Sequence, residues 1–159
     1  MGARTSPTAG DGDLTGSGGY EKVADDLVMR SRVVLVDVRP ERRALMRGVV
    51  EMAIGPGTVR AEVASGSEAL AAVERHHADA VIVEIQLPVA EGLAVIAALR
   101  SAHPAVAILV CTFHHDRTTE REATEAGADA YLVKPVNARD VRAALGSVPL
   151  PPLADTAAR

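Results

Sequence analysis

Four polar residues in this chain of 159 residues each come directly after an apolar run, where a buried strand would end. Asp37 follows VVLV, Glu84 follows AVIV, Thr112 follows AILVC and Lys134 follows AYLV. A carboxylate at the end of a buried strand is costly unless it is paired or used. Two acids, a hydroxyl and an amine in equivalent positions therefore predict one polar site. In it, the acids are either paired with cations or have a functional role.

The elements that must hold these residues alternate between strands and helices. Continuous apolar runs predict the strands, and apolar positions at helical spacing predict the helices. The predicted strands are 33–38, 58–64, 80–85, 105–112 and 130–134, and the predicted helices are 41–52, 67–77, 92–101, 118–127 and 137–145. Five strand–helix pairs predict a doubly wound, five-stranded parallel sheet with helices on both faces. Its working site should lie at the carboxyl ends of the strands, where the strand order reverses.

Single residues indicate where three of these helices begin or end. Ser67 is a predicted N-cap, because its hydroxyl can accept a hydrogen bond from the first turn of a helix. Gly127 is the predicted C-terminal stop of the fourth helix, and Gly146 that of the last one.

The ends of the chain differ in composition from this core. Residues 1–31 are predicted to be a disordered tail or linker, because 1–19 hold mostly Gly, Ser, Thr and Asp; a short helix over 20–31 is the alternative. Three prolines within five residues predict an extended tail over 148–159. The domain itself is therefore predicted to span 32–147.

Composition also argues against several classes of function. The net charge of −4 gives no electrostatic case for binding nucleic acid or an anionic membrane. The apolar segment of a signal peptide is missing and the apolar runs are too short to span a bilayer, so a cytoplasmic protein is expected. Cys111, the only cysteine, lies in an apolar run and is predicted to be a buried, reduced thiol.

Several stretches carry a resemblance to a known family: VVLVDVRP, ASGSEAL, DAVIVEIQLPVAEGL, AILVCT and EAGADAYLVKPV. From about Arg32 to Leu145 the chain resembles the receiver domain of bacterial two-component response regulators. The resemblance implies a flavodoxin-like (βα)5 fold. It also implies an aspartate on the third strand that accepts a phosphoryl group from a histidine kinase, and a pair of acids after the first strand that helps to hold Mg²⁺. A Thr or Ser and a Lys contact the phosphoryl oxygens in that family, and an aromatic residue on the fifth strand changes rotamer on activation.

Some positions match this pattern and others depart from it. By resemblance, Asp37 is the first of the paired acids, Thr112 the hydroxyl residue and Lys134 the lysine before proline, and Tyr131 takes the place of the switch aromatic. The departures are Glu84 at the phosphoacceptor position, Val38 in place of the second acid, Arg39 after it, and Phe113 where a small residue is common.

The departures predict that phosphoryl chemistry is lost. Mg²⁺ requires nearly octahedral oxygen ligands, and Val38 removes one carboxylate while Arg39 brings a cation towards the metal position. The extra methylene of Glu84, about 1.5 Å, displaces its carboxylate from the position of attack on phosphorus. No cofactor is therefore expected, and Mg²⁺ binding should be lost or weak. The two acids could instead be balanced by Lys134 and Arg39 in a self-neutralised cluster.

Two interpretations of this cluster stay open. Glu84 could mimic a phosphorylated aspartate, or it could form a structural ion pair with Lys134 that carries no signal. Tyr131 could be a switch or an ordinary edge aromatic.

For the whole chain, the sequence predicts an atypical, stand-alone receiver that is not an enzyme and works by phosphorylation-independent contacts with proteins. The candidate partners are a kinase, a regulator or a second copy in a homodimer. A sensor of small molecules and a conventional phosphorelay regulator are the alternatives.

Overall fold

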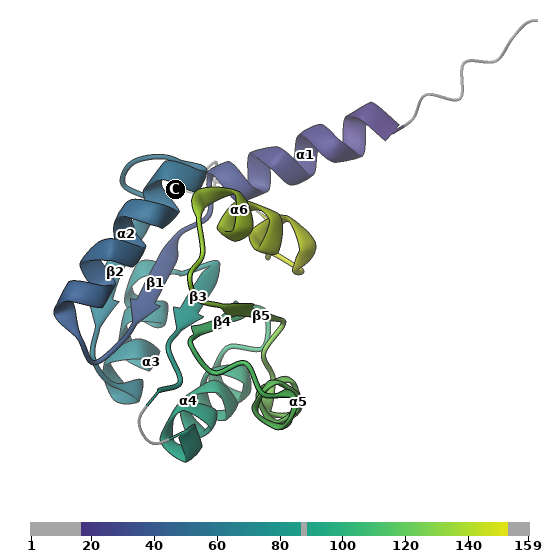
Figure 1. Cartoon of the computed structure of the whole chain (residues 1–159). Helices are drawn as coiled ribbons and strands as arrows, with labels where there is room; N and C mark the ends of the chain where they lie inside the picture. The colour runs from purple at the N-terminus through teal and green to yellow at the C-terminus, as the bar shows by residue number, and fades with distance from the viewer. Residues whose placement is uncertain (1–16, 87–88, 153–159) are drawn as a thin grey trace, which may run out of the picture.

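The computed structural model describes residues 17–86 and 89–152, which form one parallel sheet with helices around it (Figure 1). The strands are β1 (Val33–Val36), β2 (Val59–Val63), β3 (Ala80–Val83), β4 (Ala107–Thr112) and β5 (Ala130–Val133). The helices are α1 (Ser17–Met29), α2 (Pro40–Ile54), α3 (Gly66–His76), α4 (Val89–Ala102), α5 (Arg117–Ala126) and α6 (Ala138–Ser147). The predicted flavodoxin-like α/β fold is confirmed.

The five strands lie in the order β2-β1-β3-β4-β5 and are all parallel. Because successive side chains of a strand point to opposite faces, β1 contributes to two separate cores. Val33 and Leu35 pack in the core under α2 and α6, while Val34 and Val36 pack in the core under α3, α4 and α5. The near-absence of polar residues in β1, β3 and β4 follows from this burial on both faces.

The direction of winding reverses between β1 and β3, the neighbouring strands at the centre of the sheet. Asp37 and Glu84 follow directly on these two strands. The backbone N–H of Asp37 donates to the carbonyl of Val63 at 3.1 Å, and that of Glu84 donates to the carbonyl of Val36 at 2.9 Å. These bonds continue the sheet ladder past the ends of the strands, so the sheet itself fixes both acids at the reversal point.

Two of the predicted helix limits were wrong. The N-cap of α3 is Ser65 rather than Ser67, since the Ser65 hydroxyl accepts the backbone N–H of Glu68 at 3.3 Å and the helix already begins at Gly66. The last helix does not stop at Gly146 but continues to Ser147, where buried Val148 packs on the core. Gly127 does end α5, with φ of 121°, as predicted.

The prediction of a disordered tail over 1–31 was wrong for residues 17–29, which form α1. Val28 is buried in the core beside α6, and the hydroxyl of buried Ser31 donates to the carbonyl of Leu27 at 2.8 Å. The alternative of a short helix is therefore the better description of this segment. Residues 1–16 lie outside the described residues.

The C-terminal boundary is also less sharp than predicted. Val148 and Leu150 belong to the predicted tail, yet both pack on the core below α6. Residues 153–159 lie outside the described part of the chain. Along the described ranges, no helix combines the length and apolar character needed to cross a membrane.

Candidate functional site

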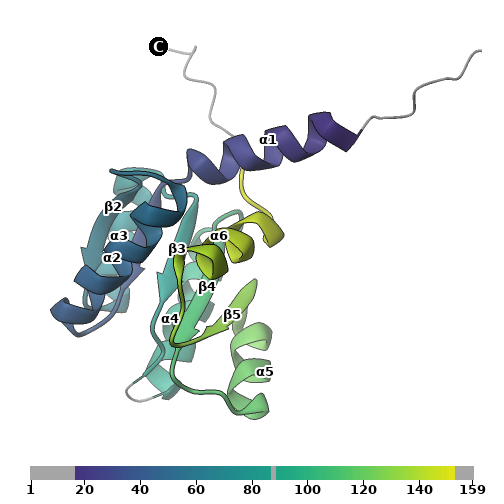
Figure 2. The ribbon, with the colours of Figure 1, turned by 45° about the horizontal axis from the view of Figure 1, so that its top comes forward.

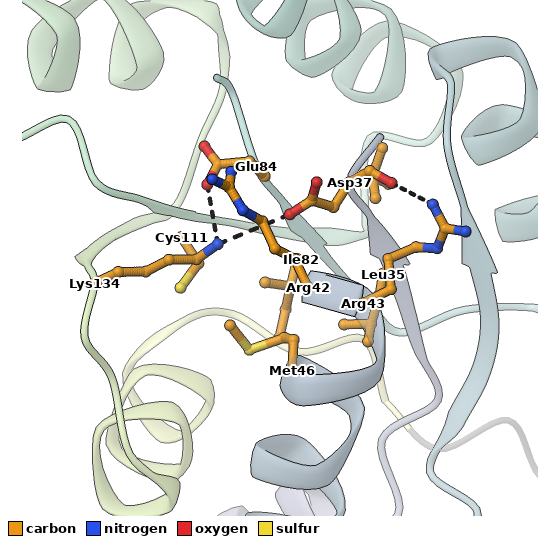
Figure 3. Close-up of a pocket in the computed structure, with 10 residues that line it drawn as sticks. Leu35, Asp37, Arg42, Arg43, Met46, Ile82, Glu84, Cys111 and Lys134 are labelled. Atoms are coloured by element: carbon orange, nitrogen blue, oxygen red, sulfur yellow. Dashed lines mark hydrogen bonds and ion pairs between the residues drawn. The ribbon is translucent and has the colours of Figure 1, made fainter. Parts of the chain in front are cut away.

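Three charged side chains meet at the carboxyl ends of β1, β3 and β5 (Figure 3). The ammonium Nζ of Lys134 lies 3.0 Å from Oε2 of Glu84 and 3.8 Å from Oδ2 of Asp37. The side chains are only 11 %, 3 % and 8 % exposed, respectively. In such a dry environment an unpaired charge is costly, so one lysine between two acids stabilises all three.

Both carboxylate oxygens of Glu84 accept a hydrogen bond. Oε2 accepts a hydrogen bond from Lys134, and Oε1 accepts the backbone N–H of Gln86 at 2.9 Å. The backbone bond comes from two residues further along the same segment, so it fixes the direction of the side chain. Glu84 is therefore held towards Lys134 from both sides.

The carboxylate of Asp37 is held in a similar way. Oδ1 accepts the backbone N–H of Arg39 at 2.9 Å, while Oδ2 faces Lys134. The guanidinium of Arg43 donates to the backbone carbonyl of Asp37 at 2.6 Å. These two hydrogen bonds hold Asp37 against the turn between β1 and α2.

The arginines of the pocket are not the one that the sequence suggested. Arg39 contributes its backbone N–H, and its side chain is exposed. Arg42 and Arg43 line the pocket instead, and Arg42 donates to the side-chain oxygen of Gln86 at 2.5 Å. The physical reason is the start of α2 at Pro40, which turns the first-turn arginines, rather than Arg39, towards the sheet. Val38 is also turned outwards and is half exposed.

Thr112 and Tyr131 hold the loop that follows β4. Fully buried Thr112 accepts the backbone N–H of His114 at 3.3 Å, and the phenol of Tyr131 donates to the carbonyl of His114 at 2.8 Å. Burial, reinforced by the charges of Asp116 and Glu120, raises the pKa of Tyr131 to about 12. The structure thus brings Asp37, Glu84 and Lys134 together, whereas Thr112 at the end of β4 and Tyr131 in β5 bind the loop that follows β4.

Phe113 covers the lysine from the outside. Its ring centroid lies 5.4 Å from Nζ of Lys134 and 5.6 Å from the guanidinium carbon of Arg42. Both distances are within the range of cation–π attraction. The ring, half exposed, therefore bridges the two cations across the mouth of the pocket.

The space left between these groups is small. The pocket lined by Asp37, Arg42, Glu84 and Lys134 has a volume of about 10 Å³, about the space that one water molecule needs. Cys111 lies at its floor, buried as predicted, and burial raises the pKa of its thiol to about 12, with further raising by Glu84 and Asp37 against a lowering by Lys134. Since the thiolate is the reactive form, this cysteine is a packing residue.

Sequence reasoning missed Arg42, Arg43 and Gln86. The pair of arginines after Pro40 was visible as the start of a helix, but only the position of that helix shows which side chains face the sheet. Among the residues that the structure describes, no three His, Cys, Asp or Glu side chains are grouped so that they could hold a metal ion.

Comparison with known proteins adds an independent line of evidence. Residues 33–146 match the response regulator receiver domain family. The chain is 32% identical over 113 residues to the positive alginate biosynthesis regulatory protein of Pseudomonas aeruginosa, covering 71% of this chain and 45% of the relative. It is 27% identical over 120 residues to the chemotaxis protein CheY of Halobacterium salinarum, covering 76% of this chain and 98% of the relative.

Solved structures of response regulators have a similar fold. A two-component response regulator of the LuxR family from Aurantimonas sp. SI85-9A1 superposes with a TM-score of 0.65 at 29% identity, over 75% of this chain and 87% of that one. The chain spans about half the length of the first regulatory proteins that it matches among curated proteins. The matched region begins at β1, so α1 lies outside it.

Proposed function

Because the chain belongs to the response regulator receiver domain family of two-component signalling, we propose that it is an atypical receiver, one that works through protein contacts without taking up a phosphoryl group. The observation that carries this proposal is the buried ion pair of Glu84 with Lys134, whose charged atoms lie 3.0 Å apart. By the resemblance of the sequence to this family, Glu84 stands at the position of the phosphoacceptor and Lys134 at that of the lysine before proline. Its partners would be proteins, such as a kinase, a regulator or a second copy, and it would have no enzymatic activity.

Glu84 is poorly placed to attack phosphorus. A nucleophilic carboxylate needs an oxygen lone pair in line with the leaving group, because phosphoryl transfer depends on positioning. Both oxygens of Glu84 already accept hydrogen bonds, one from Lys134 and one from the backbone of Gln86. Attack would have to use the remaining lone pair of one of these oxygens, in a pocket with space for about one water molecule.

The residues present do not fit the Mg²⁺ ion of the family. Such an ion takes oxygen ligands in a nearly octahedral arrangement, with carboxylates among them. Here Asp37 directs one oxygen to the backbone of Arg39 and the other to Lys134, and half-exposed Val38 replaces the second acid. The guanidinium groups of Arg42 and Arg43 line the same pocket and would repel a divalent cation.

The carboxylate of Glu84 suits a receiver held in one state. A carboxylate carries less charge and fewer acceptor oxygens than a phosphoryl group. It nevertheless engages the same lysine continuously, so Lys134 stays drawn towards β3 without any modification. The proposal is that this state is the one that partner proteins recognise.

The decisive experiment exposes the full chain to acetyl phosphate and Mg²⁺ and measures its intact mass. We expect no phosphoryl adduct. The matched control is the double variant Glu84→Asp with Val38→Asp, which restores both missing acids of the family. It should bind Mg²⁺ more tightly than the unmutated chain, seen as larger shifts of backbone amide signals, although Arg42 and Arg43 keep this binding weak. A stoichiometric adduct on the unmutated chain would refute the proposal and favour the conventional phosphorelay regulator.

A sensor of small molecules is the other class of function that this crevice allows. On the far side of Asp37 and Glu84 lies a hollow of about 180 Å³ that Ser65 and Glu91 also line. Native mass spectrometry of the purified chain separates the two functions. A co-purifying metabolite would favour the sensor, and the mass of the bare chain would favour the proposal made above.

A further inference from the structure

The charged groups at the carboxyl ends of the strands do not balance one another. Three cations and two acids line the pocket of about 10 Å³: Arg42, Arg43, Lys134, Asp37 and Glu84. Lys134 lies 3.0 Å from Glu84 and 3.8 Å from Asp37, so it is the cation that both acids share. Counted together, these groups carry a surplus of one positive charge, which a single anion would neutralise.

The surplus charge lies on the two arginines, because both bind uncharged oxygen atoms. Arg42 donates to the side-chain oxygen of Gln86 at 2.5 Å, and Arg43 donates to the backbone carbonyl of Asp37 at 2.6 Å. Among the described residues, no carboxylate lies within ion-pair distance of either guanidinium. A guanidinium has five N–H donors, and its planar fork matches the two oxygens of a carboxylate.

Arg42, unlike Arg43, also lines an apolar groove between α2 and the segment after β5. Figures 1 and 2 show α2 and α6 side by side, and the groove lies where both helices begin. Its volume is about 170 Å³. The groove is lined by Arg42, Leu45, Met46, Val49, Phe113, Lys134, Pro135 and Val136.

The walls of the groove are partly fixed and partly exposed. Met46, Val49 and Val136 are partly buried and pack on the core, so this side of the groove is already formed. Leu45 and Phe113 are 73% and 52% exposed. Large apolar side chains gathered at an exposed groove often mark a site of interaction.

The size and the charge of the groove limit what can fill it. Its volume is well below the roughly 300–1,000 Å³ of sites for drug-sized ligands, so its occupant has a single ring or a short alkyl chain. The one cation of the groove that has no acid beside it is Arg42, among the residues that the structure describes. A phosphate group would bring more negative charge than the surplus and would find few donors on the apolar walls. A carboxylate with an apolar body matches both properties.

We propose that this groove binds a free, small monocarboxylate with an apolar body, such as an aryl or short alkyl carboxylate. The carboxylate accepts hydrogen bonds from the guanidinium of Arg42, and the apolar body packs against Met46 and Val49. This site differs from the hollow beside Ser65, which has other walls. The proposal does not rest on the chemistry of Glu84, so it stands apart from the proposal on phosphorylation.

The test is a titration of the full chain with three probes, followed by backbone amide NMR signals at neutral pH. Benzoate has both the ring and the charge, acetate has the charge without the ring, and benzamide has the ring without the charge. We expect benzoate to bind with a dissociation constant at least about tenfold lower than that of either other probe. The shifts should saturate and concentrate in residues 42–49, at Phe113 and at Val136.

Four results of this titration would overturn the proposal. Equal binding of acetate would show a site for anions in general, and equal binding of benzamide would show that the charge has no part. Shifts centred on Ser65 and Gly66 would place benzoate in the other hollow. Absence of saturable shifts would leave the groove as a surface for protein partners only. These measurements use the unmutated chain and leave the intact-mass test of phosphorylation unaffected.

The variant Arg42→Gln tests the charged end of the site. It should raise the dissociation constant of benzoate about tenfold or more and leave that of benzamide unchanged. Arg47→Gln is the matched control, because Arg47 lies on the same helix, pairs with Glu51 and Glu62, and does not line the groove. An equal loss in both variants would assign the effect to net charge and would overturn the assignment to Arg42.

The variant Leu45→Ser tests the apolar wall. It should weaken benzoate severalfold and leave the weak binding of acetate unchanged. Met52→Ser is its control, because Met52 is 80% exposed on α2 but does not line the groove. Benzoate binding that is equally strong in Leu45→Ser and Met52→Ser would contradict the proposed position of the ring.

Discussion

Replacing Lys134 by methionine tests the central contact of the candidate site. The change keeps the length of the side chain and removes its charge, so Glu84 and Asp37 lose their cation while the pocket stays filled. Both acids are less than 10% exposed, with side chains at 3% and 8%. The variant therefore isolates the electrostatic part of the interaction from packing.

The expected loss of stability can be bounded from the structure. At an effective dielectric constant of about 20, unit charges at the observed 3.0 Å and 3.8 Å attract by about 5.5 and about 4.4 kcal/mol. Dehydration of the three groups offsets much of this, and removal of one partner from a buried pair costs about 3–5 kcal/mol. Protonation of one leftover acid limits the cost, because neutralising an ordinary glutamic acid at pH 7 takes about 3.7 kcal/mol. We expect Lys134→Met to lower the free energy of unfolding by about 3–4 kcal/mol.

Urea unfolding followed by far-ultraviolet circular dichroism is the appropriate assay, because the chain has no tryptophan. The double variant Lys134→Met with Glu84→Gln is the control. Gln keeps the shape of Glu84 and still accepts the backbone N–H of Gln86, so it should restore at least about half of the loss. A loss below about 1 kcal/mol in Lys134→Met, the value of an exposed ion pair, would refute the picture of a self-neutralised pocket.

Three further predictions concern the surroundings of the pocket. The raised pKa of Tyr131 means that the folded state holds its phenol proton more tightly, so this residue adds stability that is complete below about pH 10 and is lost as the pH rises towards 12. Tyr131→Phe should therefore reduce the fall in the free energy of unfolding over this pH range, measured by urea unfolding. An unchanged fall would exclude Tyr131 as its source. Gly92→Ala should destabilise the fold, because the new Cβ would lie 2.7 Å from the backbone of Ile85, whereas Gly48→Ala, with open space around it in α2, should stabilise it by up to about 1 kcal/mol in the same assay. Phe113→Leu removes the ring between Lys134 and Arg42 and should cost about 1 kcal/mol at low salt; an equal cost at high salt would assign the loss to packing rather than to cation–π attraction.

The fold could be predicted from the sequence because the pattern of apolar residues in each strand matches the way that strand is buried. Strands β1, β3 and β4 are buried on both faces, and each is a continuous apolar run that no amphipathic helix would show. The limits of the helices were harder to predict, because a cap is chosen by backbone geometry. Ser65 and Ser67 have the same hydroxyl and lie two residues apart, and only the entry of the chain from β2 makes Ser65 the cap of α3.

The sequence predicted the three central residues of the candidate site but not the arginines around them. Asp37, Glu84 and Lys134 end parallel strands, so their meeting follows from topology, and the charge count that suggested a pair agrees with the short contact. The choice between Arg39 and Arg42 depended on where α2 begins and how its first turn faces the sheet, which the spacing of charges does not determine. Helix α1 was harder still, because Val28, near its end, is the one residue of α1 with a described side chain that is buried in the core.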